Sequence, residues 1–85
     1  MKIIISESVI STPKEFTVNA TTVREALQKV IDLDGKFKPV FYLSNNVPQP
    51  YLFYVIDGVL MTKDILDMKT KGTETVEVLS AVSGG

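Results

Sequence analysis

Cysteine, histidine and tryptophan are all absent from this 85-residue chain. Without cysteine or histidine it has no thiol nucleophile, no imidazole base, no Cys/His zinc site and no disulfide bond. These absences exclude most of the chemistry that a protein performs with its own side chains. We therefore expect no enzyme and no bound metal or cofactor, but a carrier or binding protein.

An excess of charge and a long hydrophobic run are also missing. Nine basic and ten acidic residues give a formal net charge of -1, which provides no overall positive field for nucleic acid or anionic lipid. The longest uninterrupted apolar run, residues 51–56, is far shorter than the roughly 18 residues of a membrane span. No signal peptide is recognisable. We expect a cytoplasmic protein, monomeric when free, that binds neither nucleic acid nor membrane.

Two strands are expected at the start of the chain. Residues 1–9 contain the β-branched run Ile3-Ile4-Ile5, which favours a strand. Residues 14–18 alternate between polar and apolar side chains, a pattern typical of a half-buried strand. The short, turn-rich segment 11–13 between them predicts that the two strands form a hairpin.

A helix is predicted from Thr22 onward, because the hydrophobic period changes there from 2 to about 3.6 residues. Thr22 and Glu25 have the spacing of a capping box. The end is expected near Asp34-Gly35, with Gly35 as a left-handed C-cap. The apolar residues of one helical face are Val23, Ala26, Leu27, Val30 and Ile31.

The second half of the chain alternates between apolar runs and turn signals. Residues 40–43 are consistent with a short strand, and residues 44–50 are dense in turn-forming residues and predict an exposed loop. Asp57-Gly58 between two apolar runs predicts a type I′ hairpin. We expect a short helical turn over residues 63–68 and a turn over residues 71–73.

A last strand over residues 75–82 completes an α+β pattern. A single amphipathic helix must bury its apolar face against a sheet in so short a chain. We therefore expect a β-grasp (ubiquitin-like) fold, with a mixed four- to five-stranded sheet packed on one main helix. Residues 1–82 would form the domain and residues 83–85 a flexible reactive tail. The predicted core is Ile3, Ile5, Phe16, Val18, Val23, Leu27, Val30, Ile31, Val55, Val76 and Val78.

The last residues, Gly84 and Gly85, are unsuited to a core, because glycine buries no side chain and loses the most backbone entropy on ordering. A narrow tail would instead let a terminal carboxylate enter the active site of another protein. Such a carboxylate reacts only after activation, for example by adenylation. A sulfur nucleophile would then leave a thiocarboxylate, and an amine would leave an amide. A sulfur carrier, a ubiquitin-like modifier joined to lysines through Gly85, and a plain β-grasp interaction module are all open at this point.

Three segments resemble the ThiS/MoaD family of ubiquitin-like sulfur carriers: residues 22–27, residues 50–58 and the ending 76–85. The resemblance implies that Gly85 is adenylated by a ubiquitin-activating-type enzyme, which uses ATP and a sulfur donor. It also implies that Gly84 and Gly85 form the reactive C-terminus and that Val82 and Ser83 are recognised as the tail enters its partners.

The same resemblance implies an acceptor enzyme, such as the large subunit of molybdopterin synthase, of which this chain would be the small non-catalytic subunit. The molybdopterin pathway is our first expectation. The tungsten-cofactor, thiamine, cysteine and tRNA-thiolation pathways stay open.

A partner surface is also predicted. Alternation in the last strand turns Leu79 outward if Val76 and Val78 face the core, and Ile4 has the same status between Ile3 and Ile5. In a β-grasp sheet the first and last strands lie side by side, and Leu60 resembles an interface residue of the family. We expect Ile4, Leu60 and Leu79 to form an exposed apolar patch that binds a partner. The alternative is that the loop over residues 45–50 buries one or two of them.

Overall fold

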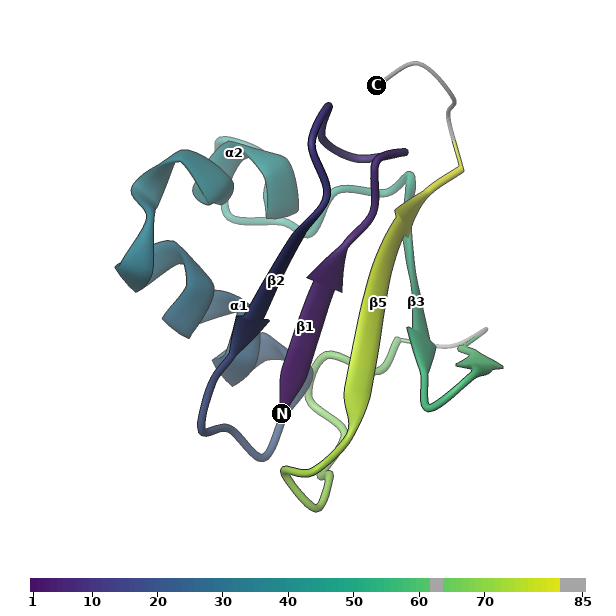
Figure 1. Ribbon diagram of the computed structural model, residues 1–85. Coiled ribbons are helices and arrows are strands. Elements are labelled where there is room, and N and C mark those ends of the chain that lie inside the picture. The colour runs from purple at the N-terminus through teal and green to yellow at the C-terminus, as the bar shows by residue number, and fades with distance from the viewer. Residues whose placement is uncertain (62–63, 82–85) are drawn as a thin grey trace.

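The computed structural model describes residues 1–61 and 64–81. Within them, strands form one mixed sheet in the order β2-β1-β5-β3-β4. Figure 1 shows this sheet with α1 passing behind β2, so that the helices lie on one side of it. None of the described helices is long and apolar enough to cross a membrane. The elements are β1 Lys2–Ile5, β2 Lys14–Thr17, α1 Val23–Leu33, η1 (a 3-10 helix) Gly35–Phe37, α2 Lys38–Phe41, β3 Leu52–Ile56, β4 Val59–Leu60 and β5 Thr75–Ser80.

Both predicted hairpins are confirmed. β1 pairs antiparallel with β2, and β3 pairs antiparallel with β4. The β3–β4 turn has positive φ at both central residues, 50° at Asp57 and 83° at Gly58, as a type I′ turn requires. The first and last strands lie side by side as expected, because β1 and β5 form a parallel pair.

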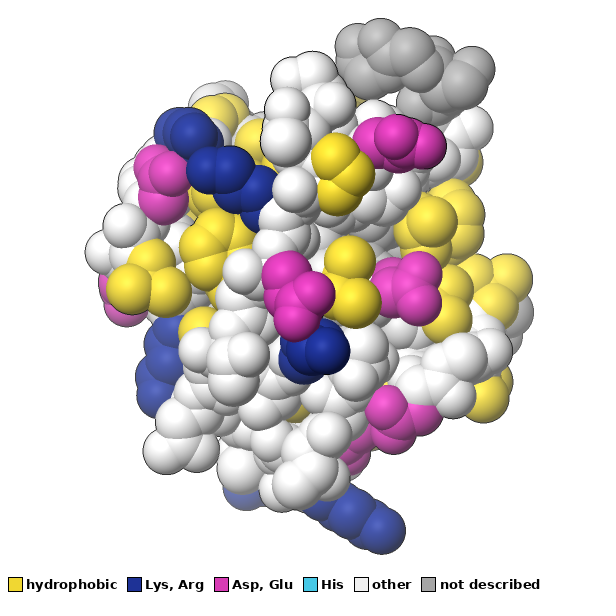
Figure 2. Space-filling model, in the orientation of Figure 1, with side chains coloured by type: hydrophobic (Ala, Val, Ile, Leu, Met, Phe, Trp, Pro, Cys, Tyr) yellow, Lys and Arg dark blue, Asp and Glu magenta, His cyan; other side chains and the backbone are white. Residues whose placement is uncertain are grey.

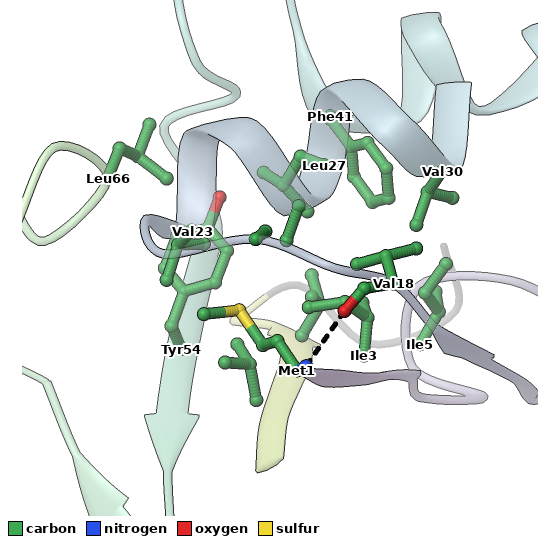
Figure 3. Close-up of a cluster of buried hydrophobic side chains, with 14 of the residues drawn as sticks. Met1, Ile3, Ile5, Val18, Val23, Leu27, Val30, Phe41, Tyr54 and Leu66 are labelled. Carbon is green, nitrogen blue, oxygen red and sulfur yellow. Dashed lines mark hydrogen bonds between the residues drawn. The ribbon is translucent and has the colours of Figure 1, made fainter. Parts of the chain in front are cut away.

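Helix α1 begins where the capping box predicts. The Glu25 N–H donates to Thr22 Oγ1 at 3.1 Å, and Glu25 Oε1 accepts from the Thr21 N–H at 2.8 Å. The Glu25 carboxylate thus accepts a hydrogen bond from Thr21, the residue before the N-cap Thr22. Figure 3 shows side chains of α1 pointing into the cluster of buried residues from the sheet. The fully buried stripe is Val23, Ala26, Leu27 and Val30.

The C-terminus of α1 differs from the prediction of a left-handed Gly35. Asp34 ends the helix in an extended conformation, with φ -153°. Its N–H donates to the Val30 carbonyl at 2.9 Å, and its carboxylate accepts from the Lys36 N–H at 3.2 Å. One residue therefore ends α1 and begins η1, so the chain needs no left-handed residue at this cap.

The predicted strand over residues 40–43 is wrong, because the chain forms helix α2 there instead. Pro39 lacks an N–H and fits the first turn of a helix. Phe37 and Phe41 lie four residues apart, are both buried, and place their rings 5.9 Å apart. The expectation of a sheet packed on one main helix is therefore wrong, since η1 and α2 bring aromatic side chains to the core beside α1.

Three further expectations need correction. Residues 64–68 contain a turn at Leu66-Asp67 and no helix, although Ile65 and Leu66 are buried there. Strand β5 ends at Ser80 and Ala81 lies in a bend, whereas the predicted last residue of the strand, residue 82, lies outside the described residues. Val55 does not join the core, because Leu52, Tyr54 and Ile56 are the β3 residues that face inward.

The core lies between the sheet and the helical layer, and the rest of its prediction is largely confirmed. No charged side chain is buried among the described residues. Phe16 and Ile31 are only partly buried against the core. Figure 3 also shows the Met1 backbone nitrogen donating to the Val18 carbonyl, at 2.8 Å. The predicted residues that are buried are Ile3, Ile5, Val18, Val23, Leu27, Val30, Val76 and Val78.

Candidate functional site

The face of the sheet that turns away from the helices carries a row of aligned side chains. Ile4 lies opposite Glu77, Glu77 opposite Val55, and Val55 opposite Leu60. Paired residues on neighbouring strands project from the same face, so these four share one surface. Phe53, which lies opposite Leu79, belongs to the same face because each is two residues from a member of the row.

We call Ile4, Phe53, Val55, Leu60 and Leu79 the outer-face patch. Leu60 is 53% exposed, and none of the five is among the buried residues. The structure thus brings the three predicted interface residues to one face, and the loop over residues 45–50 does not bury them. Figure 2 shows yellow side chains gathered over β5 and β3, with magenta carboxylates among them.

Phe53 and Val55 were missed by the sequence analysis. The run over residues 51–56 is apolar at every position, so it gives no alternation to indicate which side chains turn outward. The pairing of β3 with β5 was the signal that could have placed them, because Leu79 had already been predicted to face outward.

Carboxylates divide the patch. Ile4 lies between Glu15 on β2 and Glu77 on β5, and Glu15 forms an ion pair with Lys2 at 3.1 Å. Glu77 also lies opposite Val55 and two residues before Leu79, so this carboxylate borders the apolar surface that runs from Leu79 across β3 to Leu60. We therefore regard Phe53, Val55, Leu60 and Leu79 as the main contact area and Ile4 as its rim.

Strand β5 lies in the middle of the sheet. Hydrogen bonds hold it in place as far as its last residues. The Ser80 N–H donates to Ser8 Oγ at 3.0 Å, and the Ala81 N–H donates to the Tyr51 carbonyl at 2.8 Å. The predicted tail residues Val82, Ser83, Gly84 and Gly85 lie outside the described residues. In the sequence they follow directly after Ala81.

The start of β5 is fixed by a turn that the Glu74 side chain closes. Its two carboxylate oxygens accept from the Lys71 and Gly72 N–H groups, each at 2.8 Å. The bond from Lys71 is the main cause of a pKa of Glu74 below its ordinary value of 4.5. Gly72 has φ 91°, and a Cβ there would lie 3.0 Å from the Ala20 carbonyl oxygen, so both conformation and space favour glycine.

The outer face presents apolar side chains on neighbouring strands. Within residues 1–61 and 64–81, no group of three or more histidine, cysteine, aspartate or glutamate side chains could hold a metal ion. The patch presents apolar contact area beside a strand that leads into the last residues of the chain. Comparisons with protein-family models, curated proteins and solved structures find no match to this chain.

Proposed function

We propose that this protein is a β-grasp sulfur carrier of the ThiS/MoaD kind, which is activated at Gly85. The sheet order supports the fold: a parallel pair of first and last strands, β1 and β5, joins two antiparallel hairpins. Helix α1 follows the first hairpin and packs its buried stripe against the sheet. The Gly-Gly ending of the sequence supports the activity.

The observation that carries the proposal is the position of Leu79 and Phe53, the part of the outer-face patch that lies nearest to the C-terminal end of β5. Leu79 lies in the last part of this strand, beyond the residues that pair with β1 and opposite Phe53 of β3. Four residues separate Ala81 from the end of Gly85, and four extended residues span at most about 14 Å. An enzyme that acts on the Gly85 carboxylate must therefore approach the domain closely, and Leu79 and Phe53 give it an apolar surface.

The proposed reaction has two steps. A carboxylate oxygen of Gly85 attacks the α-phosphorus of ATP, so that pyrophosphate leaves and an acyl adenylate forms. Hydrosulfide, generated from the sulfur donor at the activating enzyme, then attacks the acyl carbon. AMP leaves with the former carboxylate oxygen, and Gly85 carries a thiocarboxylate. All catalytic groups belong to the partner, consistent with a chain that contains no cysteine or histidine.

The tail residues have separate roles in this proposal. Gly84 and Gly85 keep the end narrow, and Val82 and Ser83 are read by the partner as the tail enters it. The acceptor is an enzyme such as the large subunit of molybdopterin synthase, where the sulfur is delivered to a cofactor precursor. The patch that binds the activating enzyme is also expected to bind this acceptor, so the two partners compete.

Intact-mass spectrometry after incubation with ATP, sulfide and a cognate adenylating enzyme tests the proposal. The expected result is a mass gain equal to the exchange of one oxygen for one sulfur, which Gly85→Lys and deletion of residues 84–85 abolish without unfolding the domain. The proposal requires Gly85 to end the mature protein, and the mass of the natively expressed chain measures this. No sulfur gain, or a native chain that extends past Gly85, contradicts it. Conjugates through Gly85 to lysines would instead assign a protein modifier.

A further inference from the structure

A concave site lies on the helical side of the molecule, in the layer opposite the outer-face patch. Its volume is about 390 Å³, which is within the range of pockets that bind small molecules. Helix α1 forms one wall, and the start of α2 and the loop after it form the other. The lining residues are Arg24, Gln28, Ile31, Lys38, Tyr42 and Asn46.

The charged side chains that line this pocket are cations. Among the described residues, those that line it include two cations, Arg24 and Lys38, and no carboxylate. Lys38 makes no ion pair within the described part of the chain. The protein as a whole has a net charge of -1, so a carboxylate-free pocket with two cations is a local feature.

Arg24 is held in place by its surroundings. Its Nε and Nη2 donate to the two carboxylate oxygens of Asp67, at 2.7 and 3.1 Å, and its backbone N–H donates to the Leu66 carbonyl at 2.9 Å. Asp67 offsets part of its charge, so Lys38 supplies the larger share of the net field. A bidentate pair fixes the plane of the guanidinium.

The uncharged residues that line the pocket offer both hydrogen-bonding groups and apolar surface. They suit a ligand with a polar and an apolar part. Tyr42 is only 9% exposed, and burial raises the pKa of its hydroxyl, an effect that Arg24 opposes. The side chain therefore stays a neutral hydrogen-bond donor near pH 7. Gln28 already donates to Asp32 at 3.0 Å, which leaves its carbonyl and Asn46 as adaptable polar groups. Ile31 and the Tyr42 ring supply apolar contact.

We infer that this pocket binds a small organic anion, with a carboxylate or phosphate group between Lys38 and Arg24 and an apolar part against Ile31 and Tyr42. A bare inorganic anion would leave most of the volume and the apolar wall unused. The inference is independent of sulfur transfer, because no lining residue belongs to the outer-face patch or to the tail.

Titrations followed by ¹H–¹⁵N NMR test the inference, with phenyl phosphate, benzoate and neutral benzyl alcohol as probes. We expect saturable shifts in residues 24–31 and 38–46 with the two anions and weaker ones with benzyl alcohol. The tighter of the two anions assigns the phosphate or the carboxylate class. Lys38→Gln should weaken the binding of the better anion about tenfold. Lys36→Gln is the matched control, because Lys36 pairs with Asp34 at 3.4 Å and does not line the pocket.

A further variant separates the two parts of the ligand. Ile31→Ala should weaken phenyl phosphate binding more than inorganic phosphate binding, since only the former uses the apolar wall. The absence of saturable shifts up to about 10 mM of either anion overturns the inference. Equal binding of benzyl alcohol, or equal effects of Lys36→Gln and Lys38→Gln, also overturns it. Sulfur loading of Lys38→Gln stays at the wild-type level whichever result is obtained.

Discussion

The two faces of the sheet have similar side chains and different surroundings. Ile3 and Ile5 are 0% exposed beneath the helices, whereas Ile4, between them on the same strand, remains partly exposed. Val78 and Leu79 differ in the same way on β5. Residue type therefore does not decide the role of these positions. The helical layer covers one face only, so apolar residues stabilise the fold on the inner face and are available to a partner on the outer face.

The largest expected effect comes from truncating the same residue type on each face. Ile3→Ala should lower the free energy of unfolding by about 2–5 kcal/mol, because it leaves a cavity in a packed core. Ile4→Ala should cost less than about 1 kcal/mol. Urea denaturation of both variants measures the difference, and equal losses would mean that the outer face is covered in solution.

The inner face also predicts a dependence on alkaline pH. Burial raises the pKa of Tyr54 to about 12, and its hydroxyl has no hydrogen-bond partner among the described residues. The neutral phenol therefore contributes stability that is complete below pH 10 and lost as the pH rises toward 12. The loss should be about 2–3 kcal/mol.

Tyr54→Phe should remove most of this dependence, whereas Tyr51→Phe, at a position 39% exposed, should leave it unchanged. Urea denaturation at several pH values between 9 and 12 provides the measurement. An unchanged pH profile in Tyr54→Phe would show that another group titrates in this range.

A charge on the outer face should weaken a partner without unfolding the domain. Leu79→Glu places a carboxylate in the apolar part of the patch and should cost more than about 1–2 kcal/mol of binding to the activating or acceptor enzyme. Leu33→Glu is the control, because Leu33 is 67% exposed on the helical side. Calorimetric titration with each enzyme measures the loss. If both variants bind equally well, the patch is not the interface.

The smallest expected effect concerns the turn before β5, which the Glu74 carboxylate closes. The depressed pKa of Glu74 means that its carboxylate contributes stability above its unfolded pKa, and that this contribution is lost as the pH falls below about 4.5. Glu74→Gln should show a weaker dependence on acidic pH than the wild type. Thermal melts between pH 3 and 7 test this. Glu25→Gln is the comparison, because it removes a carboxylate that accepts a backbone hydrogen bond at a different place, the start of α1.

Sequence alone predicted the elements whose local pattern of apolar residues, caps or turn residues matches the structure that they adopt in the fold. The α1 stripe has a clear helical period and cap, and Asp57-Gly58 fits only a tight turn. Helix α2 was not predicted, because a short apolar segment such as residues 40–43 has no period long enough to separate strand from helix. Its identity depends on Phe37 and Phe41 reaching a core that other elements build.

The candidate site was predicted only in part, because only some of its residues lie in segments with a clear alternating pattern. Leu79 and Ile4 lie in alternating strands, so their outward direction could be inferred, but Val55 lies in a run with no polar residue and was assigned to the wrong face. Only the pairing of β3 with β5 settles that direction. The α1–α2 pocket was invisible in the sequence, because its walls come from residues up to 22 positions apart, Arg24 to Asn46.

The central position of β5 has a consequence for protein synthesis. This strand is the last among the described residues, yet it joins β1 to β3 and so connects the two hairpins into one sheet. A ribosome that has released residues 1–70 has produced both hairpins and α1 without the strand that lies between them. Pairings between such distant residues form late and slowly, and the apolar inner faces stay uncovered until then. The two hairpins are therefore expected to join into one sheet only when residues 75–80 are available to pair with both of them.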